Sequence, residues 1–425
     1  MRNRIPSGET NEKYIISGGR KLNGEVRIMS AKNSLLPLIA CSVMVNDEVF
    51  LSDCERTSDA ENMLDIVRGL GGKCHFDNGG ICLDCRHING HKTNAELTGK
   101  LRSSVFILGP LLSRMHRADI CYPGGCDIGL RPIDLHLTGL SSLGVKFTSE
   151  GERIAGECTE LKGREVTLPL PSVGATENII MAATMAEGRT VIRGAAAEPE
   201  IIDLQRFINM CGGKVSGAGT GRICVDGVNS LHGCSFAPSG DRIAAGTFMI
   251  GCAMCGGDVD IIGVDAAHVV SVTGLLRAAG AEITERIGGV RVKSSGNLRA
   301  PGRIETKPYP GFPTDLQAPM TALAASAKGT SYIIENLFEN RFRHIPQLLK
   351  MGADITVCGR AATVRGRKLH SADLVAEDLR GGAALVLAAL SADGTSTVSG
   401  LSHIDRGYYK LDERFRALGA DIIRM

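Results

Sequence analysis

The chain repeats one pattern of apolar and polar positions six times. Each copy is an amphipathic stretch, such as residues 203–210 or 269–278, that ends at a glycine and continues into apolar positions. The copies are 67 to 73 residues apart, and their glycines are Gly71, Gly144, Gly212, Gly280, Gly352 and Gly419. The pattern predicts a helix closed by a glycine and then a strand, which forms a hairpin in the first five copies.

A second pattern alternates with the first. It is a polar start followed by a helix-length run of mostly Ala, Leu, Ile, Val, Met and Gly. A helix that is apolar on every face is buried, so each unit contains one buried helix, one amphipathic helix and several strands. Six such units suit two domains of three units each. The six starts lie near Lys32, Arg102, Ser172, Arg242, Asp315 and Arg380.

Four of these six starts carry Lys or Arg. The helix dipole disfavours a cation at a helix N-terminus, unless an anion lies between the two. Free N–H groups at helix N-termini also favour phosphate and carboxylate. The pattern therefore indicates a site for an anionic ligand where several starts converge. The alternative is that each start only caps its helix and that each arginine is solvated.

Composition and charge exclude several classes of protein. The chain has 425 residues, with 48 basic and 46 acidic side chains and a formal net charge of +2. That balance favours neither nucleic acid nor a membrane surface as a partner. Residues 1–13 are polar and lack the apolar region of a secretion signal. The 14 cysteines are therefore expected to be reduced thiols of a cytoplasmic protein.

Several longer phrases carry a resemblance that covers residues 14–425. They include Ala31-Lys32-Asn33, Leu101-Arg102-Ser103-Ser104, Pro123-Gly124-Gly125-Cys126-Asp127, Ser172-Val173-Gly174-Ala175-Thr176, Phe312-Pro313-Thr314-Asp315, Phe338-Glu339-Asn340-Arg341-Phe342 and His403-Ile404-Asp405-Arg406-Gly407. In their order and spacing they resemble the UDP-N-acetylglucosamine 1-carboxyvinyltransferases of the enolpyruvyl transferase family.

The resemblance implies an α/β fold of two domains, each an inside-out α/β barrel of three βαβαββ-type units. By analogy, one domain is residues 31–240 and carries the Cys126 loop, a lid over the cleft between the domains. The other domain is residues 1–30 together with 241–425. The chain is expected to be a monomer or a weak homo-oligomer.

The implied reaction moves the enolpyruvyl group of phosphoenolpyruvate to the 3-hydroxyl of UDP-N-acetylglucosamine. Addition and elimination release phosphate, in the first committed step of peptidoglycan synthesis in the cytoplasm. The reaction requires no cofactor and no metal. Two alternatives remain: a non-catalytic paralogue that binds a UDP-sugar and regulates, and enolpyruvyl transfer to another acceptor, as in the shikimate pathway.

The resemblance also assigns roles at the reacting atoms. Cys126 would protonate the enol carbon and react with epoxide inhibitors of the fosfomycin type. Asp315 would be the base near the sugar hydroxyl, and Asn33 would hydrogen-bond the intermediate. Lys32, Arg131 and Arg406 would hold phosphoenolpyruvate, since guanidinium groups bind phosphate and carboxylate through paired donors.

Further residues are implied at the rest of the cleft. Arg380 would lie near the carboxylate of phosphoenolpyruvate, Arg102 would reach both substrates, and Glu198 would be a second carboxylate. Residues expected to bind the sugar nucleotide are Arg131, Pro132, Ile133, Asp134, Leu135, Ser172, Val173, Gly174 and Leu337. His136 is expected to be structural, and Ala244 stands where the family often has Glu.

One local pattern indicates a metal instead. Cys82, Cys85, His87 and His91 offer four zinc ligands within ten residues, although this spacing is tighter than in most zinc sites. Cys252 and Cys255 have a similar spacing, but they lie in an apolar helix and are expected to be core residues.

Overall fold

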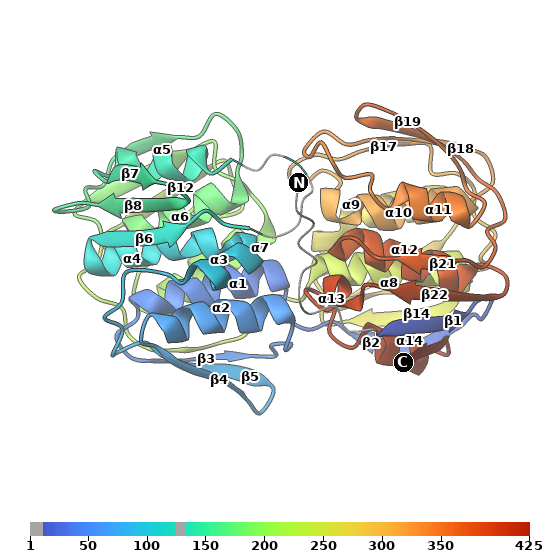
Figure 1. The fold of residues 1–425 in the computed structure, drawn as a ribbon, viewed down its shortest axis with the longest axis horizontal. Coiled ribbons are helices and arrows are strands. Elements are labelled where there is room, and N and C mark those ends of the chain that lie inside the picture. Colours follow the sequence, from blue (N-terminus) through green and yellow to red (C-terminus); the bar gives the residue numbers. More distant parts are fainter. Residues whose placement is uncertain (1–11, 125–128, 130–131) are drawn as a thin grey trace.

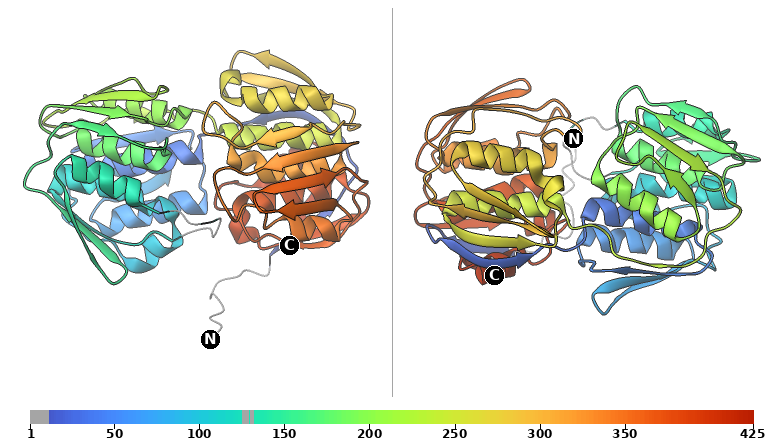
Figure 2. Two further views of the ribbon diagram at one scale, coloured as in Figure 1. Left: turned by 90° about the horizontal axis from the view of Figure 1, so that it is seen from above. Right: turned by 180° about the vertical axis from the view of Figure 1, so that it is seen from behind.

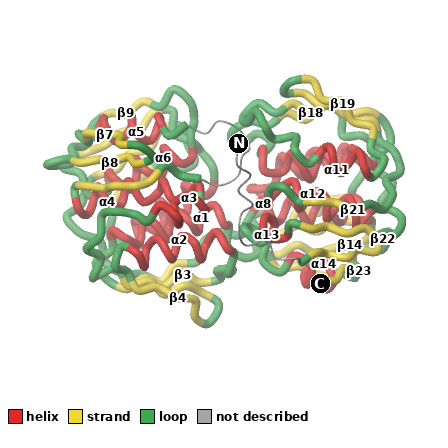
Figure 3. Tube along the Cα trace, viewed as in Figure 1, coloured by secondary structure: helices red, strands yellow, loops and turns green. Residues whose placement is uncertain are grey.

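The fold consists of two halves (Figure 1), and each half has three buried helices and three sheets. The structure is a computed structural model that describes residues 12–124, 129 and 132–425. Helices occupy the middle of each half and strands the periphery (Figure 3). The predicted class, an inside-out α/β architecture, is therefore confirmed. No helix in the described residues is long and apolar enough to span a bilayer.

The six predicted buried helices are all present. Two of them begin later than expected, because short 3₁₀ segments at Arg102–Ile107 and Thr314–Leu316 precede the α-helices. The buried helices are α1 (Lys32–Cys41), α4 (Leu108–Met115), α6 (Val173–Ala183), α8 (Arg242–Cys255), α10 (Gln317–Ser326) and α12 (Leu379–Ser391).

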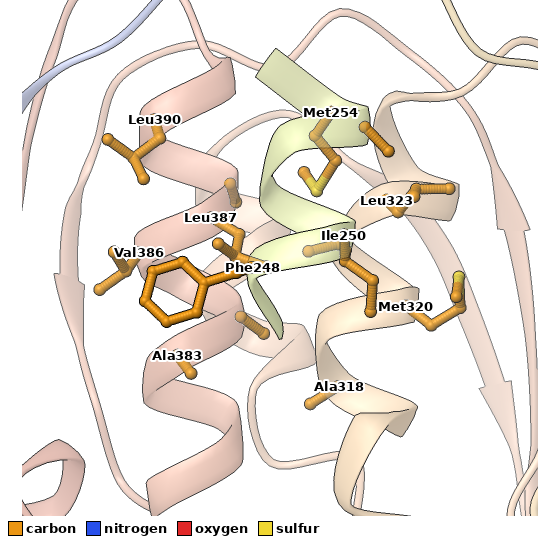
Figure 4. Packing of buried hydrophobic residues seen from close by; sticks show 14 of the residues in the cluster. Phe248, Ile250, Met254, Ala318, Met320, Leu323, Ala383, Val386, Leu387 and Leu390 are labelled. Carbon is orange, nitrogen blue, oxygen red and sulfur yellow. The ribbon is translucent and has the colours of Figure 1, made fainter. Parts of the chain in front are cut away.

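Helices α8, α10 and α12 pack directly on one another at the centre of the second half (Figure 4). Phe248 of α8 and Leu387 of α12 are at most 1% exposed, and so is Met320 of α10. Because apolar side chains project from these helices toward each neighbour, they have no face left for solvent. The polar residues at their starts are thereby confined to the helix ends.

The amphipathic helices pack against strands of the sheets, and each is followed by the repeated glycine. All six glycines have a positive φ, between 84° at Gly352 and 106° at Gly144. The predicted glycine-terminated helix is thus confirmed in every unit. These helices are α2 (Ser58–Gly69), α5 (Asp134–Ser142), α7 (Pro199–Met210), α9 (Val270–Ala279), α11 (Ile345–Lys350) and α14 (Leu411–Ala417), and the short helices are α3 (Ala95–Lys100) and α13 (Leu401–Ile404).

Helix α9 allows a matched test of this glycine, since Gly274 lies inside it and Gly280 ends it. A Cβ at either position would meet no atom within 4 Å, but only Gly280 has a positive φ, of 105°. Gly280→Ala should lower stability by about 1–2 kcal/mol through left-handed strain. Gly274→Ala should raise it by about 0.8–1 kcal/mol through helix propensity. The thermal midpoints should shift in opposite directions, and equal shifts would contradict the assigned cap.

Each sheet joins one short parallel strand to an antiparallel group. The second sheet of the first half is an exception and has only three strands. A single parallel bridge between Lys92 and Asp119 stands in place of its parallel strand. In sheet order the strands are β13 (Ser235–Phe236), β3 (Glu48–Ser52), β5 (Gly80–Asp84) and β4 (Lys73–Asp77); β6 (Arg117–Cys121), β8 (Arg153–Glu157) and β7 (Lys146–Glu150); and β11 (Lys214–Ser216), β12 (Arg222–Asp226), β10 (Arg189–Arg193) and β9 (Glu165–Thr167).

The sheets of the second half repeat this order, and two of them use strands from the N-terminal segment. Strand β1 takes the place of the second hairpin strand, which the sixth unit lacks, and β2 is the parallel strand beside β14. The strands are β15 (Glu282–Arg286), β16 (Gly289–Ser294), β14 (Gly257–Ile262) and β2 (Leu22–Arg27); β17 (Arg303–Glu305), β18 (Thr330–Ile334), β20 (Ala361–Arg365) and β19 (Asp354–Cys358); and β21 (Asp373–Val375), β22 (Thr395–Ser399), β1 (Lys13–Ser17) and β23 (Asp421–Arg424).

The chain crosses between the halves twice, near residues 30 and 240, and the two linker segments lie side by side (Figure 2). Ser30 and Gly240 form an antiparallel bridge, and the Asp241 N–H donates to Met29 O at 2.9 Å. One hydrophobic core contains apolar residues of 35–236, and the other contains those of 14–28 and 243–422. The linkers bring the starts of α1 and α8 together.

Candidate active site

A cleft of about 650 Å³ lies where the two halves meet. Its walls combine the polar starts of buried helices with loops from both halves. The charged side chains among the lining residues include Lys32, Asp59, Arg102, Glu198, Glu200, Arg242, Asp315, Arg341, Arg380 and Arg406. The predicted convergence of basic helix starts is therefore present, and carboxylates accompany it.

Asp241 holds two helix starts together, one from each half. Its Oδ1 accepts the N–H groups of Ile243 and Ala244 in α8, at 2.8 and 2.9 Å. Its Oδ2 accepts the N–H of Lys32, the first residue of α1, at 3.1 Å. One carboxylate thus satisfies N-terminal donors of both helices. It thereby holds Lys32 and Arg242, the first residues of these helices, at the cleft.

Asp59 lies between two cations. Lys32 Nζ donates to its Oδ2 at 3.0 Å, and Arg406 Nε donates to its Oδ1 at 2.9 Å. The side chain of Asp59 is only 2% exposed. Burial acts to raise the pKa of Asp59, but Lys32 and Arg406 outweigh it and hold that pKa below its usual range. The carboxylate therefore stays charged and fixes the spacing of a lysine and an arginine from opposite halves.

Asp315 makes a second cluster of the same kind. It pairs with Arg341 through Oδ1, while Arg380 Nη2 donates to Oδ2 at 3.4 Å and Asn33 Nδ2 at 3.5 Å. Burial acts to raise the pKa of Asp315, but Arg380, Arg341 and Lys32 hold it well below its usual range. Asp315 is thus an ionised, half-buried carboxylate surrounded by cations.

The two arginines beside Asp315 keep unused donors. Nη1 of Arg380 and Nε of Arg341 are buried and have no hydrogen-bond partner among the described residues. The Arg380 guanidinium also lies 5.2 Å from the centre of the Tyr408 ring. Because a buried donor without a partner is costly, an anionic ligand that accepts from these groups would complete the cluster.

A further part of the cleft lining contains three glutamates, two of which make hydrogen bonds across the halves. Arg242 Nε donates to Glu200 Oε1 at 3.0 Å, and the Tyr309 N–H donates to Glu198 Oε1 at 3.2 Å. Glu177 is fully buried, and burial raises its pKa well above the usual range, with Glu200 adding to the effect. Burial therefore favours the neutral form of Glu177 over the charged form.

The remaining predicted site residues fall into three groups. Arg102 lies at the cleft and its Nη1 donates to Pro123 O at 3.2 Å. Ile133 is 5% exposed and packs in the core of the first half. Cys126 and Arg131 lie outside the described residues. The predicted residues that line the cleft with Arg102 are Pro132, Asp134, Leu135, Ser172, Val173, Gly174 and Leu337.

Two residues of the charged clusters have no predicted role in the sequence. Asp59 stands in the first turn of α2 after the cap Thr57, where an acidic residue needs no further explanation. Arg341 lies in one of the phrases that carry the resemblance, but no local pattern distinguishes it from a surface arginine. Only the long-range contacts with Arg406 and Asp315 reveal them.

His136 and the zinc pattern have different outcomes. His136 is 8% exposed, and its Nδ1 accepts from Asn178 Nδ2 at 2.8 Å, which agrees with a structural histidine. The four proposed zinc ligands are not gathered, because Cys85 is 1% exposed and Cys82 lies on the outer face of its sheet. In an extended segment, residues three apart point to opposite faces.

The second cysteine pair behaves as expected. Cys252 is fully buried and Cys255 packs against the same core. Burial raises the pKa of each thiol to about 12, so both remain protonated. Ala244, which replaces a common Glu, is 7% exposed beside the caps of Asp241.

Comparisons with known proteins agree on the family. The sequence model described as EPSP synthase (3-phosphoshikimate 1-carboxyvinyltransferase) matches residues 16–415. A UDP-N-acetylglucosamine 1-carboxyvinyltransferase 1 of Caldanaerobacter subterraneus subsp. tengcongensis is 47% identical over 413 residues, which cover 97% of this chain and 99% of the relative. The UDP-N-acetylglucosamine 1-carboxyvinyltransferase 2 of Carboxydothermus hydrogenoformans is 45% identical over 417 residues, covering 97% and 99%.

Solved structures share the fold at lower identity. The enolpyruvyl transferase NikO from Streptomyces tendae superposes with a TM-score of 0.87 at 23% identity, covering 98% of this chain and 99% of NikO. An EPSP synthase from Acinetobacter baumannii gives 0.74 at 19% identity, covering 98% and 100%. The chain therefore belongs to the EPSP synthase family of enolpyruvyl transferases, and within it to the UDP-N-acetylglucosamine 1-carboxyvinyltransferases.

Proposed function

We propose that the protein transfers the enolpyruvyl group of phosphoenolpyruvate to the 3-hydroxyl of UDP-N-acetylglucosamine and releases phosphate. The observation that carries this proposal is the cleft, in which Asp59 and Asp315 each hold cations from α-helix starts and loops. The names of relatives that are up to 47% identical over nearly the whole chain support the acceptor. The reaction would serve peptidoglycan synthesis.

Asp59 organises the part of the site that receives phosphate. Lys32 and Arg406 approach its two oxygens at 3.0 and 2.9 Å, so the ammonium and the guanidinium both lie at one place in the cleft. A phosphate there accepts charge-assisted hydrogen bonds from both. The same cations stabilise the charge that grows on phosphate as it leaves. Arg131 would join them.

Asp315 acts as the base for the sugar hydroxyl. While Arg341 and Arg380 are both paired with Asp315, its pKa lies well below the usual range, and a carboxylate in that state is a weak proton acceptor. When the carboxylate of phosphoenolpyruvate binds Arg380, it shares the cation and the pKa of Asp315 rises. The base therefore becomes effective only when the second substrate is present.

The reaction proceeds by addition and elimination. The 3-hydroxyl oxygen attacks C2 of phosphoenolpyruvate and gives its proton to Asp315, while the Cys126 thiol protonates C3. Asn33 hydrogen-bonds the intermediate. The Cys126 thiolate then takes a proton back from C3, and phosphate leaves C2 with the proton held by Asp315, which gives the enol ether and restores both groups. No step in this scheme calls on a metal or a cofactor.

The sugar nucleotide occupies the first half of the cleft. Ser172 caps α6 by accepting the Ala175 N–H at 3.4 Å, which places Val173 and Gly174 at a helix N-terminus suited to a diphosphate. Pro132, Asp134 and Leu135 form the adjacent wall and would contact the uridine. Leu337 lines the same cleft from the second half.

Closure of two domains over the substrates completes the proposal. We place the domains at 31–240 and at 1–30 with 241–425, which agrees with the two hydrophobic cores and the paired linkers.

The 13 cysteines in the described residues are free, in keeping with a reaction in the reducing cytoplasm.

The acceptor is tested by incubating the protein with phosphoenolpyruvate and, separately, UDP-N-acetylglucosamine, other UDP-sugars and shikimate 3-phosphate. Mass spectrometry should find a carboxyvinyl ether of UDP-N-acetylglucosamine and none of shikimate 3-phosphate. A product only from another acceptor would change the substrate and keep the chemistry. No product from any acceptor, with UDP-N-acetylglucosamine still bound, would favour a regulatory paralogue.

A further inference from the structure

A cluster of metal-ligand side chains lies on the outer face of the first sheet, outside the cleft. In the hairpin of β4 and β5, His75 is directly opposite Cys82. Asp77 is two residues beyond His75 and so points to the same face. One ligand atom from each of the three lies within 4.8 Å of the other two. The sheet thus assembles a different set from the one that local spacing indicated.

We propose that His75, Asp77 and Cys82 bind one divalent transition metal ion of borderline softness, with Zn²⁺ the best match. Imidazole nitrogen, carboxylate oxygen and thiolate sulfur are the three ligand types that Zn²⁺ uses in proteins. A thiolate and a carboxylate together balance the charge of the ion. Water supplies the fourth ligand, because the face is open to solvent.

The required rearrangement is small. Bonds of about 2.0–2.3 Å to zinc place tetrahedral ligand atoms roughly 3.5 Å apart, so the present atoms must approach by about 1 Å. His75 and Asp77 are exposed and can change rotamer, while Cys82 is half-buried. The ladder between the two strands fixes all three backbones, so binding needs little ordering of the chain. Binding forms the sulfur–metal bond and releases the thiol proton of Cys82 to solvent.

Cobalt(II) is a suitable probe, because a cobalt–thiolate bond gives a charge-transfer absorption in the near ultraviolet. Titration of the full chain should produce this band, and Cys82→Ser should abolish the part that saturates first. His75→Ala and Asp77→Asn should each weaken binding at least tenfold. The matched control is Cys358→Ser, because Cys358 is an exposed cysteine in β19, the strand of the second half that corresponds to β4, and should leave the titration unchanged.

The comparison is a difference between variants, so contributions from other thiols cancel. Competition by Zn²⁺ should remove the band, and Zn²⁺ should raise the thermal midpoint of the wild type more than that of Cys82→Ser. A wild type without the band, or an unchanged first-saturating part of the band in Cys82→Ser, would overturn the proposal. Unchanged affinity in both His75→Ala and Asp77→Asn would also overturn it, since a single thiol would then explain the binding.

Discussion

Asp315→Asn should reduce sugar-dependent phosphate release by about 10²–10⁴-fold in kcat, the range expected when a general base is lost. Asparagine keeps the shape of the side chain but cannot accept the hydroxyl proton. It also leaves Arg341 and Arg380 without their carboxylate. Steady-state kinetics at saturating concentrations of both substrates would measure the effect.

The control for this substitution is Asp354→Asn. Asp354 also pairs with two arginines, Arg365 and Arg367, but on an exposed strand, and its loss should leave kcat within about twofold, as for ordinary surface changes. Circular dichroism should show both variants folded. If Asp315→Asn retains more than a tenth of the wild-type kcat, Asp315 is not the base.

Asp59→Asn should weaken the binding of phosphoenolpyruvate more than the binding of the sugar nucleotide. An amide does not neutralise Lys32 and Arg406, which then repel each other and lose the spacing set by the carboxylate. Loss of hydrogen bonds to charged groups costs about 1.5–3 kcal/mol, which corresponds to a rise in KM for phosphoenolpyruvate of roughly 10- to 100-fold. KM for UDP-N-acetylglucosamine should change much less.

Glu61→Gln is the matched control, since Glu61 lies in the same first turn of α2 but pairs with Arg56 and Arg68 outside the cleft. It should leave both KM values unchanged. Equal rises in the two KM values of Asp59→Asn would mean that the carboxylate holds the two halves together in general. No rise would show that Lys32 and Arg406 keep their places without it.

Local sequence was enough to predict the repeated elements, because their causes are local. A glycine is needed where the backbone has a positive φ, as at Gly280, and a uniformly apolar helix such as α8 has to be buried. The partners of β1 and β2 could not be read in the same way. They pair with strands near residues 421–424 and 257–262, and no local pattern records such pairings.

The site shows the same limit. Lys32, Arg102 and Arg380 stood out because cations are unusual at helix starts. Asp59 did not, because an acidic residue in a first helical turn is ordinary. Its function comes from Arg406, 347 positions along the chain. The spacing of Cys82, Cys85, His87 and His91 was misleading for a related reason. On one face of a strand, the neighbours of a residue are those two positions away and those on the adjacent strand, such as His75 beside Cys82.

The most direct test of the central claim measures phosphate released from phosphoenolpyruvate by the wild type and by Cys126→Ala, with and without UDP-N-acetylglucosamine. The account predicts release by the wild type only when the sugar nucleotide is present, and none above background from Cys126→Ala. Release that does not depend on the sugar nucleotide, or that continues at the wild-type rate in Cys126→Ala, would contradict enolpyruvyl transfer with Cys126 as the acid.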